Sequence, residues 1–151
     1  MTSGPLVCCV DDSDEARGAL SVARSLSVAL GLELVLVHVE PSTEMPGVSA
    51  APAGQQRLHR DETREAAELI ASLAADTGLG PGVAGRTEIG DPATSILEIC
   101  AELDAAFVVL GSRGRGGVAS AVLGSVSAAV AAKSPCPCVI VPPTAMPQSP
   151  P

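Results

Sequence analysis

The chain has 151 residues and a mass of 15.0 kDa, which suits one domain with enough apolar surface to fold without a metal or disulfide scaffold. It is 46% hydrophobic but has one Phe and no Trp or Tyr, which excludes aromatic surfaces for base stacking. The formal charge of −8 repels nucleic acid and anionic lipid, although oriented backbone N–H groups can still hold a small phosphate ligand.

The chain shows no signal for membrane insertion or export. No apolar run reaches the roughly 20 residues that span a bilayer, and the start of the chain lacks the pattern of a signal peptide. A cytoplasmic location is expected, with no membrane partner. The five cysteines include Cys8-Cys9 and Cys136-Pro-Cys138, which lack C-x-x-C spacing, so they are interpreted as reduced core thiols. Cys8 and Cys9 should face opposite sides of a strand, which prevents them from sharing a metal.

The first half of the chain reads as alternating strands and helices. A buried strand is predicted at Leu6–Val10, followed by a helix with Ser13 as its N-cap and Gly31 just beyond its end. A second buried strand spans Leu34–Val39. The segment Pro41–Gly54 has no periodicity and is interpreted as a mobile loop, with a lid as the alternative.

The second half continues the alternation. A long helix is expected over 55–76, with charged residues on its solvated face, and a weaker edge strand over 82–88. Asp91-Pro92 predicts the start of a helix that reaches Leu103. A fourth strand is expected over 105–110, a helix of small residues ending near Lys133, and a fifth strand over 138–141. This order predicts one α/β domain over residues 1–143, with a doubly wound parallel sheet, and a disordered Pro-rich tail over 144–151.

Two segments with polar or glycine-rich character follow predicted strands and should meet at one crevice. The first is Asp11-Asp12-Ser13, and the second runs from Gly111 to Ser127. In the second, glycines permit close backbone approach, two arginines add positive charge and a Gly-Ser-Val-Ser run adds hydroxyls, which together can surround a triphosphate. The alternative is structural: the glycines make a tight loop, and the serines cap or back-bond within a helix.

The known phosphate fingerprints do not decide between these interpretations. A Walker A loop needs Gly-Lys-Ser/Thr, whereas the only lysine, Lys133, follows an alanine. The run Gly114–Ala119 matches G-x-G-x-x-A, but it follows the fourth predicted strand and no acidic residue comes after Lys133 to hold a ribose. These facts argue against a dinucleotide fold.

The pattern Gly111-x2-Gly114-x9-Gly124-Ser125, with Ser127 after it, resembles the nucleotide-binding signature of the ATP-binding branch of the universal stress protein family. The similarity covers nearly the whole chain. It includes Val10-Asp11-Asp12-Ser13, His38-Val39, Gly90-Asp91-Pro92 and the region from Ser134 to Val141. Two departures are Asp12, where many relatives have Gly, and the thiol of Cys138.

The resemblance implies a Rossmann-like fold of the adenine nucleotide alpha-hydrolase type, with five strands in the order 3-2-1-4-5 and ATP over strands 1 and 4. By this similarity, Asp11 and the backbone at Val39 would lie against adenine and ribose. A divalent ion, Mg²⁺ or Mn²⁺, would bridge the phosphates, and Val139–Val141 would pair two copies into a homodimer. The residues implied to face ribose and phosphates are Gly111, Arg113, Gly114, Gly124, Ser125, Val126 and Ser127.

No catalytic residue is assigned, and the metal ligands are left open. His38 and His59 have no nucleophile at a recognisable spacing and are interpreted as structural or surface residues. The leading hypothesis is an ATP-binding stress-response switch with an unidentified regulatory partner. The alternatives are a nucleotide-independent dimeric interaction module and a slow, metal-dependent ATPase. Gly114→Val is expected to block approach to the phosphates.

Overall fold

The protein forms a five-stranded parallel sheet with helices on both faces. The structure is a computed structural model that describes residues 3–42, 52–80, 83–113 and 123–143, with side chains in α2 from Arg64 onward. The elements in chain order are β1 (Leu6–Cys9), α1 (Asp14–Leu30), β2 (Leu34–Pro41), α2 (Pro52–Asp76), β3 (Ala84–Gly90), α3 (Pro92–Glu102), β4 (Phe107–Gly111), α4 (Ser125–Lys133) and β5 (Cys138–Val141).

The strand order is β3-β2-β1-β4-β5, which confirms the predicted α/β fold and its order 3-2-1-4-5. β1 lies at the centre, where Leu6 pairs with Leu34 of β2 on one side and with Phe107 of β4 on the other. Every pairing in the sheet is parallel, so the carboxyl ends of the strands lie along the same side of the molecule. β3 and β5 form the two edges.

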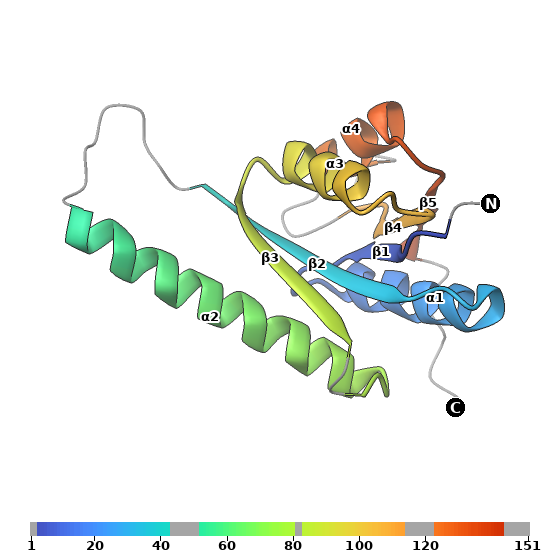
Figure 1. Cartoon of the computed structure of the whole chain (residues 1–151), viewed down its shortest axis with the longest axis horizontal. Helices are drawn as coiled ribbons and strands as arrows, with labels where there is room; N and C mark the ends of the chain where they lie inside the picture. Colours follow the sequence, from blue (N-terminus) through green and yellow to red (C-terminus); the bar gives the residue numbers. More distant parts are fainter. Residues whose placement is uncertain (1–2, 43–51, 81–82, 114–122, 144–151) are drawn as a thin grey trace.

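Each face of the sheet has its own apolar core because successive side chains of a strand point to opposite faces. Leu6 and Cys8 pack with α1 and α2, whereas Val7 packs with α3 and α4. Figure 1 shows the resulting three layers, with α1 and α2 on one side of the sheet and α3 and α4 on the other. Cys9 belongs to the second core, which confirms that the adjacent cysteines Cys8 and Cys9 face opposite sides.

The helix ends that carry local capping signals lie where the sequence predicts them. The Ser13 hydroxyl accepts a hydrogen bond from Ala16 N at 3.2 Å, and Gly31 ends α1 in the left-handed region with φ +65°. The Asp91 carboxylate caps α3 by accepting from Thr94 N at 3.0 Å. These short-range bonds satisfy backbone N–H groups at the starts of α1 and α3.

Some boundaries differ from the predictions. β2 extends two residues past the expected end at Val39, because Glu40 and Pro41 pair with the last residues of β3. α2 begins at Pro52, so the expected loop Pro41–Gly54 is wrong at both ends; proline is tolerated in the first turn of a helix. β4 begins at Phe107 instead of residue 105 and ends one residue later than expected. The predicted tail 144–151 lies outside the described residues.

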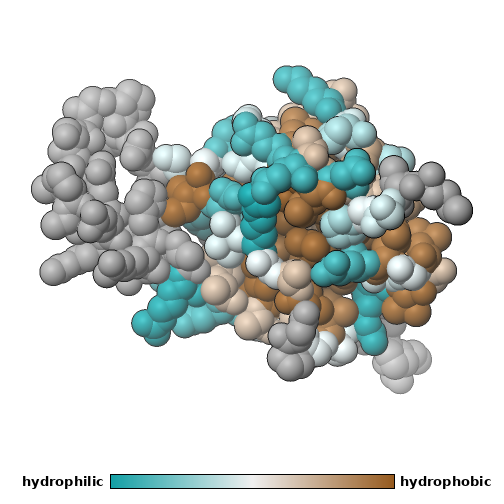
Figure 2. All heavy atoms as spheres, viewed as in Figure 1, coloured by the Kyte–Doolittle hydropathy of each residue, from teal (hydrophilic) through white to brown (hydrophobic). Residues whose placement is uncertain are grey.

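The surface combines a charged helix face with an apolar patch. The Arg64–Glu68 pair of α2 is exposed, as expected for a solvated face, with Nε and Oε1 3.1 Å apart. Figure 2 shows hydrophobic atoms exposed among polar ones, and the large hydrophobic residues that are exposed include Val28 and Leu30 at the end of α1. Within the described ranges, no helix combines the length and hydropathy needed to cross a membrane.

Candidate functional site

A cavity of about 550 Å³ opens at the carboxyl ends of the central strands. Residues from the ends of β1, β2 and β4 line it, together with the first turns of α3 and α4. Such a position, outside the carboxyl ends of a parallel sheet, is where α/β folds bind ligands. The lining includes eight of the nine residues predicted for the site: Asp11, Val39, Gly111, Arg113, Gly124, Ser125, Val126 and Ser127. The ninth, Gly114, lies outside the described residues.

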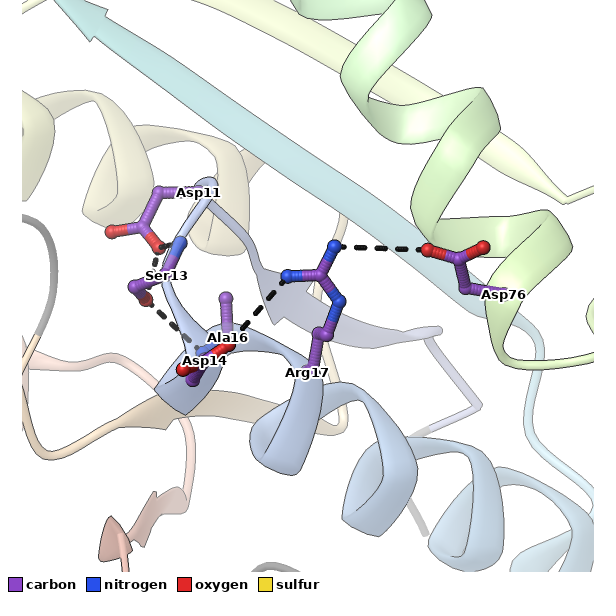
Figure 3. Close-up of polar contacts among 6 residues, drawn as sticks. All are labelled: Asp11, Ser13, Asp14, Ala16, Arg17 and Asp76. Carbon is purple, nitrogen blue, oxygen red and sulfur yellow. Dashed lines mark hydrogen bonds and ion pairs between the residues drawn. The ribbon is translucent and has the colours of Figure 1, made fainter.

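The Asp11–Ser13 turn places a carboxylate at the cavity. Asp11 Oδ1 accepts a hydrogen bond from Ser13 N at 2.9 Å and another from the Ser13 hydroxyl. The same Ser13 oxygen caps α1, so the carboxylate and the helix start are held by one side chain (Figure 3). The carboxylate is therefore oriented before any ligand arrives.

Arg17, near the start of α1, forms two ion pairs outside the cavity. Its guanidinium lies 3.9 Å from Asp14 within α1 and 3.7 Å from Asp76 at the end of α2 (Figure 3). These partly exposed contacts connect the two helices that cover the same face of the sheet. Arg17 is not among the residues that line the cavity.

The end of β4 lies tightly against α1 and α4. A Cβ added to Gly111 would stand 3.1 Å from Glu15 Cβ and 3.2 Å from Arg113 O, so this position favours glycine. The buried Ser127 hydroxyl donates to Gly111 O at 2.7 Å, and Gly124 N donates to Ser112 O at 2.7 Å. These two bonds fix the first turn of α4 over the end of β4.

The start of α4 has no side-chain cap among the described residues, unlike the starts of α1 and α3. Gly124 occupies the N-cap position, and Ser125 and Val126 of the first turn line the cavity. The first N–H groups of a helix have no partner within the helix and carry partial positive charge. With Arg113 in the same lining, this part of the cavity is suited to an anion.

His38 fastens the ends of β1 and β2 together. Its buried ring places Nδ1 2.8 Å from Val10 O and Nε2 3.1 Å from the Glu40 carboxylate. Because a carbonyl oxygen only accepts, Nδ1 donates to Val10 O. Both ring nitrogens are thus engaged by the protein, and His38 also lines the cavity. Val39, the next residue, contributes to the cavity wall. His59 lies outside the described side chains.

Cys9 is a further residue of the cavity wall that the sequence did not single out as part of the site. Burial raises its pKa well above the ordinary thiol value, and the neighbouring thiols raise it further. It therefore contributes an apolar, protonated surface instead of a nucleophile.

Other lining residues were missed because they come from elements without an obvious ligand motif. Pro92 and Ile96 belong to α3, and Leu123 precedes the start of α4. Gly90-Asp91-Pro92 marked the entry to α3, but nothing in that motif indicated that the helix faces the same crevice. Their apolar side chains suit a flat, nonpolar ring better than a phosphate.

The described residues do not form a ready-made metal cage, since no three His, Cys, Asp or Glu side chains among them are arranged to hold an ion. Mg²⁺ that arrives with a nucleotide needs no such cage, because it is coordinated mainly by phosphate oxygens and water. The anion-favouring start of α4 fits the phosphates of such a complex. The donor set is thus compatible with a nucleotide-borne ion.

Proteins of a known family share sequence identity with this protein over nearly the whole chain. A universal stress protein of Thermus aquaticus, described by its position in the QAH/OAS sulfhydrylase 3′ region, is 36% identical over 132 residues, which cover 87% of this chain and 93% of the relative. The universal stress protein YxiE of Bacillus subtilis is 30% identical over 143 residues, covering 90% and 97%.

Solved structures share the fold. The hypothetical protein MJ0577 aligns with a TM-score of 0.80 at 23% identity, covering 99% of this chain and all of that one. A universal stress protein from Archaeoglobus fulgidus in complex with dAMP has a TM-score of 0.63 at 23% identity, covering 93% and 99%. Another universal stress protein, in complex with cAMP, has the same score at 24% identity, covering 92% and 97%. The family model described as "Universal stress protein family" matches residues 3–142, and the chain therefore belongs to that family.

Proposed function

We propose that the protein binds ATP with Mg²⁺ or Mn²⁺ in this cavity and acts as a cytoplasmic, homodimeric regulatory switch. The observation that carries the proposal is that one cavity is lined by both an anion-favouring surface and an apolar surface. The start of α4, which has no side-chain cap among the described residues, and Arg113 supply an anion site, while Val39 and Ile96 supply an apolar wall. A cavity of about 550 Å³ falls within the range of roughly 300–1,000 Å³ for small-molecule sites.

The binding mode assigns a task to each part of the site. Adenine and ribose lie near Val39 and the oriented Asp11 carboxylate, and the phosphates lie at the start of α4. Ser127 contributes through its backbone, because its hydroxyl already donates to Gly111 O. Bound Mg²⁺ or Mn²⁺ supplies charge neutralisation of the phosphates. No catalytic residue is assigned, so binding without rapid turnover is expected.

The family comparisons support adenine as the base. Two universal stress proteins of the same fold are described as complexes with cAMP and with dAMP, both of which carry an adenine ring and a single phosphate. A triphosphate is favoured here because the anion-binding surface extends from Gly111 and Arg113 to the first turn of α4. A regulatory partner would then distinguish the ATP-loaded from the empty protein.

The test begins with nucleotide released from freshly purified, denatured protein and identified by mass spectrometry, followed by calorimetric titration with ATP and Mg²⁺. A Ser125→Asp variant adds negative charge at the exposed first residue of α4. The charge suits the helix dipole but repels phosphate, so the melting temperature should hold while ATP affinity falls about tenfold or more. Ser125→Asn is the matched neutral control and should bind normally.

Three results would change the assignment. A folded protein with neither bound nucleotide nor ATP affinity would contradict the switch and favour the interaction module. Metal-dependent phosphate release that is lost in Ser125→Asp but retained in Ser125→Asn would favour the slow ATPase. Equal ATP affinity in the two variants would contradict the placement of the phosphates at α4.

A further inference from the structure

The buried ring of His38 lies between the carboxyl ends of β1 and β2, in the wall of the cavity. Val39 and Glu40, the next two residues of β2, line the same cavity. Because both ring nitrogens are engaged by protein atoms, the ring acts on a ligand through the residues that it holds in place.

The turn after β1 is held to β2 by two bonds at Val10, which lies just beyond the last residue of β1. Val10 N donates to Val37 O at 2.8 Å, and Val10 O accepts from His38 Nδ1 at 2.8 Å. Asp11, the next residue, lines the cavity. The position of its carboxylate therefore depends on the bond that His38 makes to the preceding carbonyl.

The contact between His38 and Glu40 requires an additional proton. Nδ1 uses the single proton of a neutral imidazole for Val10 O, so Nε2 of that tautomer carries only a lone pair. A carboxylate oxygen also only accepts, yet Nε2 lies 3.1 Å from Glu40 Oε2. A hydrogen bond at this distance needs one proton between the two atoms. With that proton the pair is neutral overall, and without it the pair carries one negative charge.

Glu40 is the charged group that meets the ring directly. The alternation of β2 places His38 on the face that α1 and α2 cover, whereas Cys9 of β1 packs against the opposite core. In the adjacent strand β3, Glu88 pairs with Arg86 at 3.1 Å. The other described titratable groups on this side are Asp11 and Arg113, which share the cavity, and exposed or half-buried residues of the two helices: Asp14, Glu15, Arg17, Arg64, Glu65 and Glu68.

We propose that His38 is a positioning residue of the nucleotide site and that the proton it shares with Glu40 is required for tight ATP binding. This inference rests on the proposed function. With the proton present, the ring links Glu40 to Val10 and holds Asp11 and Val39 in place for adenine and ribose. Without it, Nε2 and the carboxylate repel each other, and the cavity wall gains a negative charge that opposes the phosphates. ATP affinity therefore falls as pH rises.

The test measures ATP affinity by calorimetric titration of the full-length protein at pH 6 and pH 8.5, with Mg²⁺ in constant excess. Wild-type protein should bind ATP about fivefold or more weakly at pH 8.5, because the binding-competent form holds the additional proton. Titrations at pH 8.5 in two buffers of different ionisation enthalpy should show net proton uptake when ATP binds.

Two variants of Glu40 separate the proton from the rest of the site. Glu40→Gln can donate its amide N–H to the unprotonated Nε2, so its ATP affinity should change less than about twofold between the two pH values. Glu40→Ala has no group that meets Nε2, and at pH 6 it should bind ATP about as weakly as wild type does at pH 8.5. Circular dichroism melting checks that both variants are folded.

The outcomes distinguish this inference from the proposed function. Folded wild-type protein that binds no ATP at either pH would overturn both. ATP binding with the same pH profile in wild type and Glu40→Gln would overturn the inference alone. Equally tight binding by Glu40→Ala and Glu40→Gln at pH 6 would show that the bond to the ring positions nothing.

Discussion

Because Gly111 has no side chain, α1, β4 and α4 can approach one another closely at this residue. Its backbone lies against Glu15 of α1 and accepts the Ser127 hydroxyl of α4, while the residue itself ends β4. The neighbours of an added Cβ include the Arg113 carbonyl and the first turn of α1. These atoms cannot move away as easily as the tip of a flexible side chain.

We expect Gly111→Ala to lower the free energy of unfolding by about 1–3 kcal/mol, because the added methyl overpacks this junction. Urea denaturation followed by circular dichroism measures the change. Gly80→Ala is the control, since a Cβ there has no heavy atom of the described residues within 4 Å, and it should stay within about 0.5 kcal/mol of wild type. Equal stability of the two variants would show that the junction accommodates a methyl group.

At the scale of elements, the start of α3 is capped by the carboxylate of Asp91. The Asp91 carboxylate accepts from Thr94 Oγ1 at 2.7 Å and from Thr94 N at 3.0 Å. The hydroxyl bond, and then the backbone bond, lower the pKa of Asp91 below its usual 3.8. A lowered pKa means that the cap stabilises the fold above the ordinary carboxyl pKa and is lost as pH falls through the lowered value.

Thr94→Val should raise the Asp91 pKa toward 3.8, because the larger of the two causes is removed while the backbone bond is kept. Carboxyl chemical shifts in an NMR titration report this pKa directly. Thr94→Ser, which keeps the hydroxyl, should titrate like wild type. An unchanged pKa in Thr94→Val would assign the shift to the backbone bond alone.

The elements that could be predicted from the sequence are those whose limits depend on neighbouring residues. Ser13, Gly31 and Asp91 determine helix ends by bonds or angles within a few residues, and the structure confirms all three. The extra length of β2 depends on pairing with β3, which is distant in the chain and leaves no local signal.

In the candidate site, too, features that depend on neighbouring residues could be predicted, whereas those that depend on contacts between distant segments could not. The glycine-rich and acidic segments indicated that β1 and β4 end at the cavity, and the structure places their residues there. The role of Ser127 was open between phosphate contact and back-bonding, and its hydroxyl bond to Gly111 depends on how α4 crosses β4.

At the scale of the whole molecule, β5 forms one edge of the sheet. Val108 N bonds to Pro137 O and Ser112 N bonds to Val141 O, so the odd-numbered residues of β5 face β4. The N–H of Ile140 therefore points toward the edge, where the proposed dimer would form.

Ile140→Pro should convert the proposed dimer into a monomer without breaking the bonds to β4, because proline removes only the outward N–H. Sedimentation equilibrium measures the change in mass, and circular dichroism checks the fold. Ile140→Ala shortens the side chain but keeps the N–H, so it should remain dimeric. A dimeric Ile140→Pro protein would place the interface on another surface.

The central position of β1 also has a consequence for synthesis on the ribosome. β2 can pair with one side of β1 early, but β4 leaves the ribosome roughly 70 residues later. At about 5–20 residues per second, the other side of β1 lacks its partner for roughly 4–14 s. During that interval one side of the apolar strand Leu-Val-Cys-Cys stays unpaired, which exposes the nascent chain to association with other extended segments.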